Sequence, residues 1–402
     1  MKKILIVINT LGRAGAEASM LEFLKKLDRT EYEISLYVMM GQGKLSAHLP
    51  PDIRVLNQRL SSQSVWGKRG RIRMAATVLA SYLRNGNLWG KLSVSMNYFV
   101  QMFRAGRVQI DKLFWPIVAE GARRFGESFD LAVAWMEGGS AYYVADYVNA
   151  ERKAAFVHID YENAGYTRDM DRNCWEKFGR IFAVSKEVKE SFVKFYPQQK
   201  ERTFVFPNII DSEKVRRMAQ EPGGFSDEYD GVRLLTVGRL CYQKGYDIAI
   251  QAMNLLKQRG YRVRWYVLGE GEERAHLKRQ IAALGLEKDF CLLGQVENPY
   301  PYYRQTDLYV HATRYEGKSI AIQEAQILGC AVIASDCPGN REQLMSGVDG
   351  ILCRLEPEAI ADSIAELLKD TEKRAAFKRA SEMKDMPRGK EFELLIEFMK
   401  RG

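Results

Sequence analysis

The sequence predicts two α/β domains, each built on a parallel β-sheet with helices on both faces. At 402 residues the chain is longer than one compact core usually serves. Its apolar residues, 46% of the total, gather in short continuous runs, as expected for strands buried on both faces. Amphipathic segments of helix length separate these runs almost throughout. This alternation occurs twice, which predicts two parallel sheets.

Seven apolar runs predict the strands of the first domain. The first run is too short for the core of a signal peptide and leads into glycines, which favours a strand followed by a tight turn. The expected strands are residues 2–8, 33–39, 53–57, 131–135, 153–159, 180–185 and 203–208.

Six further runs predict the strands of the second domain, with amphipathic helices between them. The polar stretch 216–231, rich in Gly and Asp, is interpreted as the linker. We therefore expect domains over 1–215 and 216–385, with a final helix in 386–402 that crosses back to the first domain. The strands are expected at 232–238, 263–269, 290–294, 308–313, 331–335 and 350–353, and the helices at 245–256, 272–284, 320–328 and 357–368.

Cysteine and histidine usage argues against disulfide and zinc sites. None of the six cysteines forms a CxxC pair, and several lie in apolar runs, as in a reduced, cytoplasmic protein. Only four histidines are present, which leaves little material for a metal centre. No run of about 18 apolar residues predicts a membrane span.

The positive charge of the chain lies in its first half. Residues 1–210 hold 31 Lys and Arg against 21 Asp and Glu, whereas the remainder holds 29 against 30. Residues 53–110 contain ten cations and no acid, interleaved with aromatic residues such as Trp66 and Trp89. This composition, within an expected helical insertion at 60–125, suits an anionic membrane surface. A solvated helical pair and a nucleic-acid surface are the alternatives. The cations are Arg54, Arg59, Lys68, Arg69, Arg71, Arg73, Arg84, Lys91, Arg104 and Arg107.

Two glycine turns follow strands and open helices. Gly12 and Gly15 follow the first strand, so the backbone N–H groups of the next helix would face the carboxyl edge of the sheet, where anions bind. Gly238 and Arg239 follow the strand 232–238, and Lys244 comes five residues after Arg239. Two cations beside a helix N-terminus can clamp a diphosphate, Arg as a planar fork and Lys as a point charge.

The segment RYEGKSIAIQEAQILG, residues 314–329, holds two carboxylates at a strand-to-helix junction. Glu316 is expected in the loop and Glu324 on the helix behind it, where both could accept hydrogen bonds from a ligand rich in hydroxyls. Gly317 would let the ligand approach the backbone, and the helix start at Ser319 and Ile320 could meet a phosphate. A solvated stripe that includes Glu324 is the alternative.

These motifs resemble family 4 retaining glycosyltransferases. The glutamate–glycine–spacer–Glu-Ala hallmark of that family is similar to EGKSIAIQEA, and its Gly-Arg…Lys clamp is similar to VGRLCYQKG. GEGEER (269–274), AGAE (14–17), VSK (184–186) and PNIID (207–211) also resemble family elements. The resemblance covers most of the chain and implies the GT-B architecture, two facing Rossmann-like domains with a cleft between them.

The resemblance also implies roles for individual residues. Arg239 and Lys244 would hold the donor diphosphate, Glu324 the nucleotide ribose and Glu316 the transferred sugar. His158, which ends AAFVHI, would point at the donor sugar from the N-terminal domain. His158, Arg239, Lys244 and Glu316 are thus the expected catalytic residues. The expected substrate-binding residues are Gly12, Gly15, Gly238, Val296, Gly317, Lys318, Ser319, Ile320 and Glu324.

The implied reaction moves a sugar from a nucleotide sugar, with UDP the commonest nucleotide in the family, to a glycan or lipid-linked glycan. The anomeric configuration would be retained, and no metal or other cofactor is implied. The enzyme would work in the cytoplasm, in polysaccharide assembly, with residues 60–110 touching the inner membrane face. Asp169 and Asp171 match a metal-binding DxD spacing, but they lie in a polar helical stretch and not after a strand.

Two rival functions remain open from the sequence. A nucleotide-sugar epimerase could use the same architecture without an acceptor. A non-catalytic nucleic-acid-binding protein could use the cations of residues 53–110, although the set of Arg239, Lys244, Glu316 and Glu324 argues against it.

Overall fold

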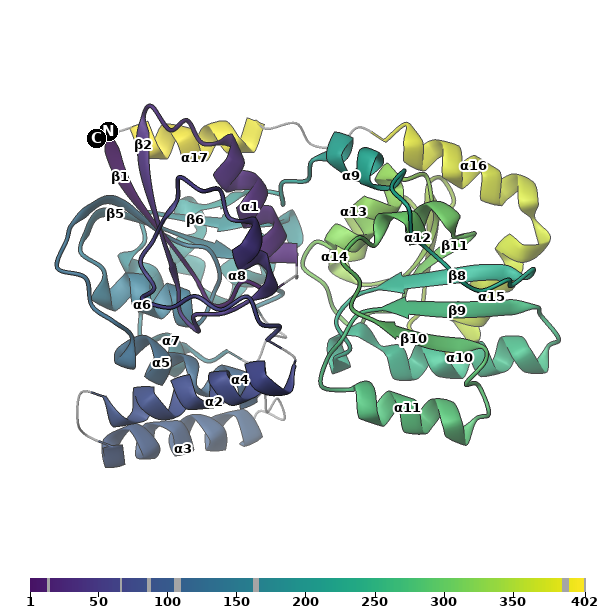
Figure 1. Ribbon diagram of the computed structural model, residues 1–402, viewed down its shortest axis with the longest axis horizontal. Coiled ribbons are helices and arrows are strands. Elements are labelled where there is room, and N and C mark those ends of the chain that lie inside the picture. Colours follow the sequence, from purple (N-terminus) through teal and green to yellow (C-terminus); the bar gives the residue numbers. More distant parts are fainter. Residues whose placement is uncertain are drawn as a thin grey trace. The chain divides into compact units, whose positions relative to one another are not determined.

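The computed structural model describes residues 1–12, 15–65, 67–84, 88–104, 110–161, 166–384 and 390–400. The chain divides into two compact units (Figure 1). The N-terminal unit comprises Met1–Ile209 together with Gly389–Gly402, and the C-terminal unit comprises Ile210–Arg388. Each unit is a parallel sheet between two layers of helices, as the sequence predicts.

The sheet of the N-terminal unit has the strand order β3-β2-β1-β4-β5-β6-β7, and all its strand pairs are parallel. The first strand lies between β2 and β4, so the chain winds outward in both directions from it. A ligand site in such a sheet forms where the two directions diverge, beyond the carboxyl ends of the strands. The strands are β1 (Lys2–Ile8), β2 (Tyr32–Val38), β3 (Arg54–Val55), β4 (Phe129–Ala134), β5 (Ala150–Val157), β6 (Arg180–Ala183) and β7 (Thr203–Val205).

Alternate residues of these strands enter two separate cores. Leu5 and Val7 face one core, whereas Ile4, Ile6 and Ile8 face the other, as the twofold repeat of a strand requires. The first core receives side chains from α3, α5, α6 and α8, and the second from α1 and α17. The helices are α1 (Gly15–Lys26), α2 (Lys68–Leu83), α3 (Leu88–Arg104), α4 (Ile110–Leu113), α5 (Trp115–Gly121), α6 (Gly139–Tyr147), α7 (Arg168–Asp171), α8 (Lys186–Phe195) and α17 (Lys390–Lys400).

The last helix, α17, packs on the N-terminal unit although it is the end of the chain (Figure 1). Leu395 and Met399 are almost fully buried against the core that contains α1. The Lys2 ammonium donates to the carbonyl oxygen of Met399 at 3.2 Å, so it caps the C-terminal end of α17. Residues 386–389 and 401–402 of the expected segment 386–402 lie outside the described residues.

The sheet of the C-terminal unit has the order β10-β9-β8-β11-β12-β13, again parallel throughout. Here β8 lies between β9 and β11, which gives a second divergence point. The strands are β8 (Val232–Val237), β9 (Val263–Leu268), β10 (Phe290–Gly294), β11 (Leu308–His311), β12 (Ala331–Ser335) and β13 (Gly350–Cys353). The helices are α9 (Ser212–Met218), α10 (Tyr246–Gln258), α11 (Arg274–Ala283), α12 (Tyr300–Gln305), α13 (Ile320–Ile327), α14 (Pro338–Arg341), α15 (Pro357–Lys369) and α16 (Thr371–Glu382).

The division between the units falls before the expected linker 216–231. Residues in and beside that stretch are bound to the C-terminal unit by polar contacts. The Asn298 amide donates to the carbonyl oxygen of Met218 at 2.8 Å, and Asp227 accepts from Arg264 at 2.6 Å. Its polar composition therefore reflects ion pairs with strand residues of the C-terminal unit, and the change of unit occurs at Ile209–Ile210 instead.

Candidate active site

The divergence point of the C-terminal sheet lies between β8 and β11. Because these strands are neighbours and parallel, the loops at their carboxyl ends must lie side by side. The first loop carries Arg239 and Lys244, and the second carries Glu316. The structure thus brings together residues 72 positions apart in the sequence.

Lys244 and Glu316 form an ion pair at this point. The Lys244 ammonium contacts Glu316 Oε2, and the two side chains are only 15% and 13% exposed. His311, the last residue of β11, lies 3.2 Å from the same carboxylate oxygen through its Nε2. Its Nδ1 lies 3.2 Å from the hydroxyl of Tyr309, so both imidazole nitrogens are engaged.

The charges of this cluster are fixed by its surroundings. Burial alone would raise the pKa of the Glu316 carboxyl, but Lys244 and His311 outweigh it and hold that pKa at about 2. Burial, together with the charge of Lys244, lowers the pKa of His311. At neutral pH the cluster therefore contains one carboxylate, one ammonium and a neutral imidazole. The imidazole donates from Nε2 to the carboxylate.

Backbone and side-chain contacts hold the loop after β8 against the loop after β11. Gly245 has a φ of +57°, and a Cβ on it would lie 2.4 Å from the carbonyl oxygen of Ala312, so only glycine fits. The Arg314 guanidinium binds both carboxylate oxygens of Asp247, at 2.9 and 2.6 Å. The backbone carbonyl oxygen of Gln243 accepts from the Arg314 backbone N–H at 2.7 Å. These contacts set the position of Lys244 beside Glu316.

Arg239 and Gly238 follow β8 directly, and the Arg239 side chain is exposed. The GEGEER turn after β9 packs onto this backbone. A Cβ on Gly269 would lie 1.9 Å from the carbonyl oxygen of Gly238, and one on Gly271 would lie 2.1 Å from that of Leu240. The glycines of this turn are therefore explained by close approach of two loops.

Glu324 lies on α13 and is held by two tyrosines from α12. The hydroxyl of Tyr300 donates to Oε1 at 3.0 Å, and that of Tyr303 donates to Oε2 at 3.2 Å. Burial raises the pKa of Glu324 to about 7, although the tyrosine hydrogen bonds oppose this. Glu324 is thus a fixed acceptor whose charge changes near neutral pH, and not a residue of a solvated stripe.

The other expected substrate-binding residues of this unit lie around the start of α13 and after β10. Ser319 is the buried N-cap residue of α13, and its side chain makes no capping hydrogen bond. Ile320 is the first residue of the helix, Gly317 is buried and Lys318 is partly buried. Val296 is partly buried and packs against the core that contains Tyr303.

In the N-terminal unit, Gly12 and Gly15 lie at the divergence point between β1 and β4. Gly15 is the first residue of α1, and a Cβ on Gly12 would lie 3.1 Å from Glu17 Oε1. Asn9, at the end of β1, donates to the carbonyl oxygen of Glu137 at 3.2 Å and accepts from the Ser140 N–H at 2.8 Å. The ends of β1 and β4 are therefore tied together. Ala14, part of the AGAE match, lies outside the described residues.

His158 lies just beyond β5, next to this point. Its backbone N–H donates to Glu137 Oε2 at 2.9 Å, and its Nε2 lies 2.9 Å from the carbonyl oxygen of Trp135. Because a carbonyl oxygen only accepts, Nε2 carries the proton and Nδ1 is the acceptor nitrogen. Burial lowers the pKa of His158, so the ring is neutral at pH 7.

Asp171 of the DxD spacing has a structural role. Its carboxylate is fully buried and accepts from the hydroxyls of Tyr142 and Tyr161, at 2.6 Å each. Tyr196 and the indole N–H of Trp175, at 3.3 Å, donate to it as well. Among the described residues, no group of three or more His, Cys, Asp or Glu side chains has the geometry of a metal site. The six cysteines are all free.

Sequence reasoning missed the side chains that position the carboxylates. His311, Tyr300, Tyr303 and Glu137 were not expected at a site. His311 ends a strand whose following loop carries Glu316, and this signal could have identified it. The tyrosines carry no comparable signal, because their contacts with Glu324 depend on how α12 packs against α13.

A family model and individual relatives agree with this site. Residues 227–384 match the model of the family described as "Glycosyl transferases group 1". This segment contains Arg239, Lys244, Glu316 and Glu324. The match therefore covers the second sheet and its divergence point, and not the N-terminal unit.

One relative extends the similarity to most of the chain, and another matches less than half of it. An N-acetylgalactosamine-N,N'-diacetylbacillosaminyl-diphospho-undecaprenol 4-alpha-N-acetylgalactosaminyltransferase of Campylobacter jejuni is 25% identical over 94% of this chain and 93% of its own length. The uncharacterized glycosyltransferase MJ1059 of Methanocaldococcus jannaschii is 27% identical, and the match spans 41% of each chain.

The fold is shown by a solved structure. The Anabaena protein Alr3699/HepE, in complex with UDP and glucose, matches with a TM-score of 0.69 and 18% identity, and the match covers both chains completely. A chain of two such Rossmann-like units has the GT-B fold. The C-terminal unit thus matches the group 1 family of glycosyltransferases, and similarity to a glycosyltransferase extends over most of the chain.

Proposed function

We propose that this enzyme transfers a sugar from a UDP-sugar to a glycan or lipid-linked glycan, with retention of the anomeric configuration. The buried Lys244–Glu316 pair at the divergence point carries the proposal, because it sets a cation and an acceptor of hydroxyl hydrogen bonds side by side. The UDP bound to Alr3699/HepE supports the choice of nucleotide. The lipid-linked acceptor in the name of the Campylobacter relative supports the choice of acceptor.

Lys244 and Arg239 would act on the diphosphate. Breaking the bond between sugar and phosphate leaves negative charge on the departing diphosphate, and fixed cations stabilise that charge. An ammonium has three donors, so Lys244 can keep its contact with Glu316 and still donate to phosphate. Arg239 offers a planar fork from an exposed position.

The two carboxylates would accept hydrogen bonds from hydroxyl groups of the donor. Glu316 stays ionised at neutral pH because Lys244 and His311 hold its pKa at about 2. It is therefore an acceptor for the hydroxyls of the transferred sugar. Glu324, oriented by Tyr300 and Tyr303, would accept from the ribose hydroxyls of the nucleotide.

Retention would follow from attack on the same face of the sugar as the leaving group. Because Glu316 is tied to Lys244 and His311, it is a poor nucleophile, and the departing phosphate would take the proton of the acceptor hydroxyl. Trapping a covalent glycosyl–enzyme adduct would overturn this step. NMR analysis of the product would show whether the anomeric configuration is retained.

Thermal-shift measurements with a panel of nucleotide sugars test the donor. A ligand at about 100 times its dissociation constant stabilises the folded state by about 2.7 kcal/mol. We expect a UDP-sugar to stabilise the wild type and to lose most of this effect in Lys244→Ala. The control is Lys257→Ala, which removes a half-exposed lysine paired with Asp289 at 2.6 Å. Equal stabilisation by ADP-, GDP- and UDP-sugars would contradict the choice of UDP.

Incubation of the enzyme with the UDP-sugar alone separates the proposal from the epimerase rival. An epimerase converts the sugar nucleotide without an acceptor, whereas a transferase needs one for turnover beyond slow hydrolysis. We expect no isomer of the sugar in the absence of an acceptor. Accumulation of an epimer would favour the rival.

A further inference from the structure

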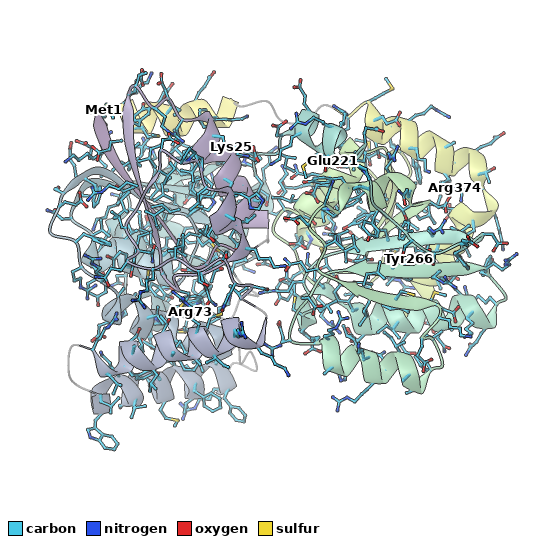
Figure 2. All side chains as sticks on the ribbon, viewed as in Figure 1. Met1, Lys25, Arg73, Glu221, Tyr266 and Arg374 are labelled. Atoms are coloured by element: carbon cyan, nitrogen blue, oxygen red, sulfur yellow. The ribbon has the colours of Figure 1, made fainter. Side chains whose placement is uncertain are left out.

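Helices α2 and α3 form an antiparallel pair whose outer face is apolar. The two helices lie side by side at the edge of the N-terminal unit (Figure 1). Tyr82 of α2 is hydrogen-bonded to Ser95 of α3, and the Lys91 ammonium donates to the carbonyl oxygen of Ser81 at 3.0 Å. Side chains project from the pair away from the rest of the unit (Figure 2).

One stripe of α3 faces the unit and the opposite stripe faces solvent. Tyr98 and Met102 are buried in the core, and Lys91 is 3% exposed. The opposite stripe consists of large apolar residues at helical spacing, which is the reverse of an ordinary solvated helix. We call it the outer stripe of α3: Trp89 (82% exposed), Leu92 (44%), Met96 (63%), Phe99 (39%) and Phe103 (69%).

Helix α2 also exposes large apolar side chains. Ile72, Leu79 and Leu83 are 69%, 61% and 64% exposed and lie at positions i, i+7 and i+11, on one side of the helix. With the outer stripe of α3 they account for eight of the large apolar side chains that are highly exposed among the described residues. A patch of this kind on a chain of ordinary composition marks an interaction surface.

The charged side chains on the two helices are all cations. Lys68 and Arg69 at the start of α2 and Arg104 at the end of α3 are exposed. Residues 53–110 supply no carboxylate at all. Two carboxylates of other segments reach the pair: Glu120 lies 3.6 Å from Lys91, and the exposed Asp169 accepts from Gln101 at 2.8 Å.

The structure also corrects which cations of residues 53–110 could face a partner. Lys91 points inward, Arg54 is paired with Glu127 at 2.8 Å, and Arg84 donates to the carbonyl oxygen of Gly121 at 3.1 Å. Arg73, labelled in Figure 2, donates to the carbonyl oxygen of Arg59 at 3.1 Å. Trp66 and Arg107, also expected in this block, lie outside the described residues.

We propose that the outer stripe of α3 and the exposed side of α2 insert into the surface of an anionic lipid bilayer. Apolar side chains would enter the boundary between headgroups and acyl chains, while Lys68, Arg69 and Arg104 would meet the phosphates. A second copy of the chain would bring no carboxylate from this segment to these cations, so it is the poorer partner. None of the described helices has both the length and the apolarity needed to span a bilayer.

Flotation with vesicles of phosphatidylcholine and phosphatidylglycerol tests this proposal. We expect the wild type to float with mixed vesicles at low salt, and to bind more weakly at about 0.15 M salt, where the screening length is about 8 Å. Replacing Trp89, Met96 and Phe103 by Gln should lower the floated fraction about tenfold or more. Replacing Lys68, Arg69 and Arg104 by Gln should lower it severalfold and remove its dependence on salt.

Matched variants separate a local effect from general loss of apolar or basic groups. Met345, Val348 and Met383 are similarly exposed in the C-terminal unit, and their replacement by Gln should leave flotation unchanged. The same is expected for Lys278, Arg279 and Lys288, which are exposed in that unit. Thermal stabilisation by the UDP-sugar should be unchanged in every variant, so a failure of the membrane proposal is distinguishable from a failure of the proposed function.

Four results would overturn the proposal. The first is a failure of the wild type to float with the mixed vesicles at low salt, and the second is flotation of the apolar triple variant to the same extent as the wild type. The third is a dimer in sedimentation that depends on the outer stripe of α3, and the fourth is binding of duplex DNA in place of vesicles. A blue shift of the Trp89 fluorescence on vesicle addition, obtained as the difference between wild type and Trp89→Phe, would support insertion.

Discussion

The two units share one topology but place different chemistry at the same point of it. In the C-terminal unit the divergence point holds an ammonium–carboxylate pair between β8 and β11, with little solvent exposure. In the N-terminal unit the corresponding point, between β1 and β4, holds backbone-tied Asn9 and Glu137 with the neutral ring of His158 beside them. A fixed charge pair suits a diphosphate, whereas an amide and a neutral imidazole suit sugar hydroxyls.

The two units also differ in what surrounds the sheet. The C-terminal unit covers its sheet with helices whose outer sides are largely polar. The N-terminal unit adds the α2–α3 pair, whose outer side is apolar. The same fold can thus gain a contact surface from an insertion without changing its sheet, because loops and insertions tolerate change better than strands do.

Removing the charge pair of the C-terminal unit should have the largest effect. Lys244→Ala should lower kcat by about 10²- to 10³-fold, because it removes a preorganised cation and leaves the Glu316 carboxylate buried without its partner. Steady-state transfer rates measure this. The control is Lys257→Ala, which removes a half-exposed lysine paired with Asp289, and its kcat should stay within about twofold of wild type. A similar loss in both variants would contradict a special role of Lys244.

The contribution of α17 to the N-terminal unit comes next. Leu395→Ala should lower the free energy of unfolding of this unit by about 2 to 5 kcal/mol, because Leu395 is fully buried in the core beside α1. Urea unfolding followed by tryptophan fluorescence measures the loss. The exposed Leu79→Ala on α2 should change stability by less than about 0.5 kcal/mol.

A change at His158 should affect turnover without affecting binding of the nucleotide. His158→Gln removes the ring held by Trp135 and should lower kcat by about 10²-fold. The UDP dissociation constant, measured by calorimetry, should be unchanged if the nucleotide binds the C-terminal unit. The exposed His276→Gln is the matched control. Weaker UDP binding in His158→Gln would contradict the assignment of nucleotide binding to the C-terminal unit alone.

The smallest expected effect concerns the charge of Glu324. Its pKa of about 7 in the folded chain lies above its ordinary value of 4.5, so the folded state keeps a proton that the unfolded chain releases between these values. The associated stability is fully present below about pH 4.5 and is lost as pH rises through about 7. At pH 8, Glu324→Gln should therefore raise the free energy of unfolding by up to about 3 kcal/mol relative to wild type, and with it Tm. At pH 4 it should change neither.

The exposed Glu287→Gln controls for the loss of a charge, and Tyr300→Phe sharpens the result. Because the Tyr300 hydrogen bond lowers the pKa of Glu324, its removal should move the pH dependence of donor binding to higher pH. A pH profile of the donor KM measures this shift. An unchanged profile in Tyr300→Phe would argue against Glu324 as the titrating acceptor.

The sequence by itself determined the two sheets, because continuous apolar runs and helix-length spacers leave few other ways to bury the chain. All thirteen expected strands are present, and several end two or more residues earlier than expected. It also predicted that Arg239, Lys244 and Glu316 would follow strands of one sheet, since the glycine turns and the polar loops mark strand ends.

Only the tertiary structure decided which of these residues meet. The strand order places β8 beside β11, so Lys244 contacts Glu316 across 72 positions, while Lys91 and Asp171 turn inward to polar partners. Charge alone could not distinguish an inward lysine from an exposed one. Burial and partner distance set the charge state of a side chain, and both depend on contacts between segments that are far apart in the sequence.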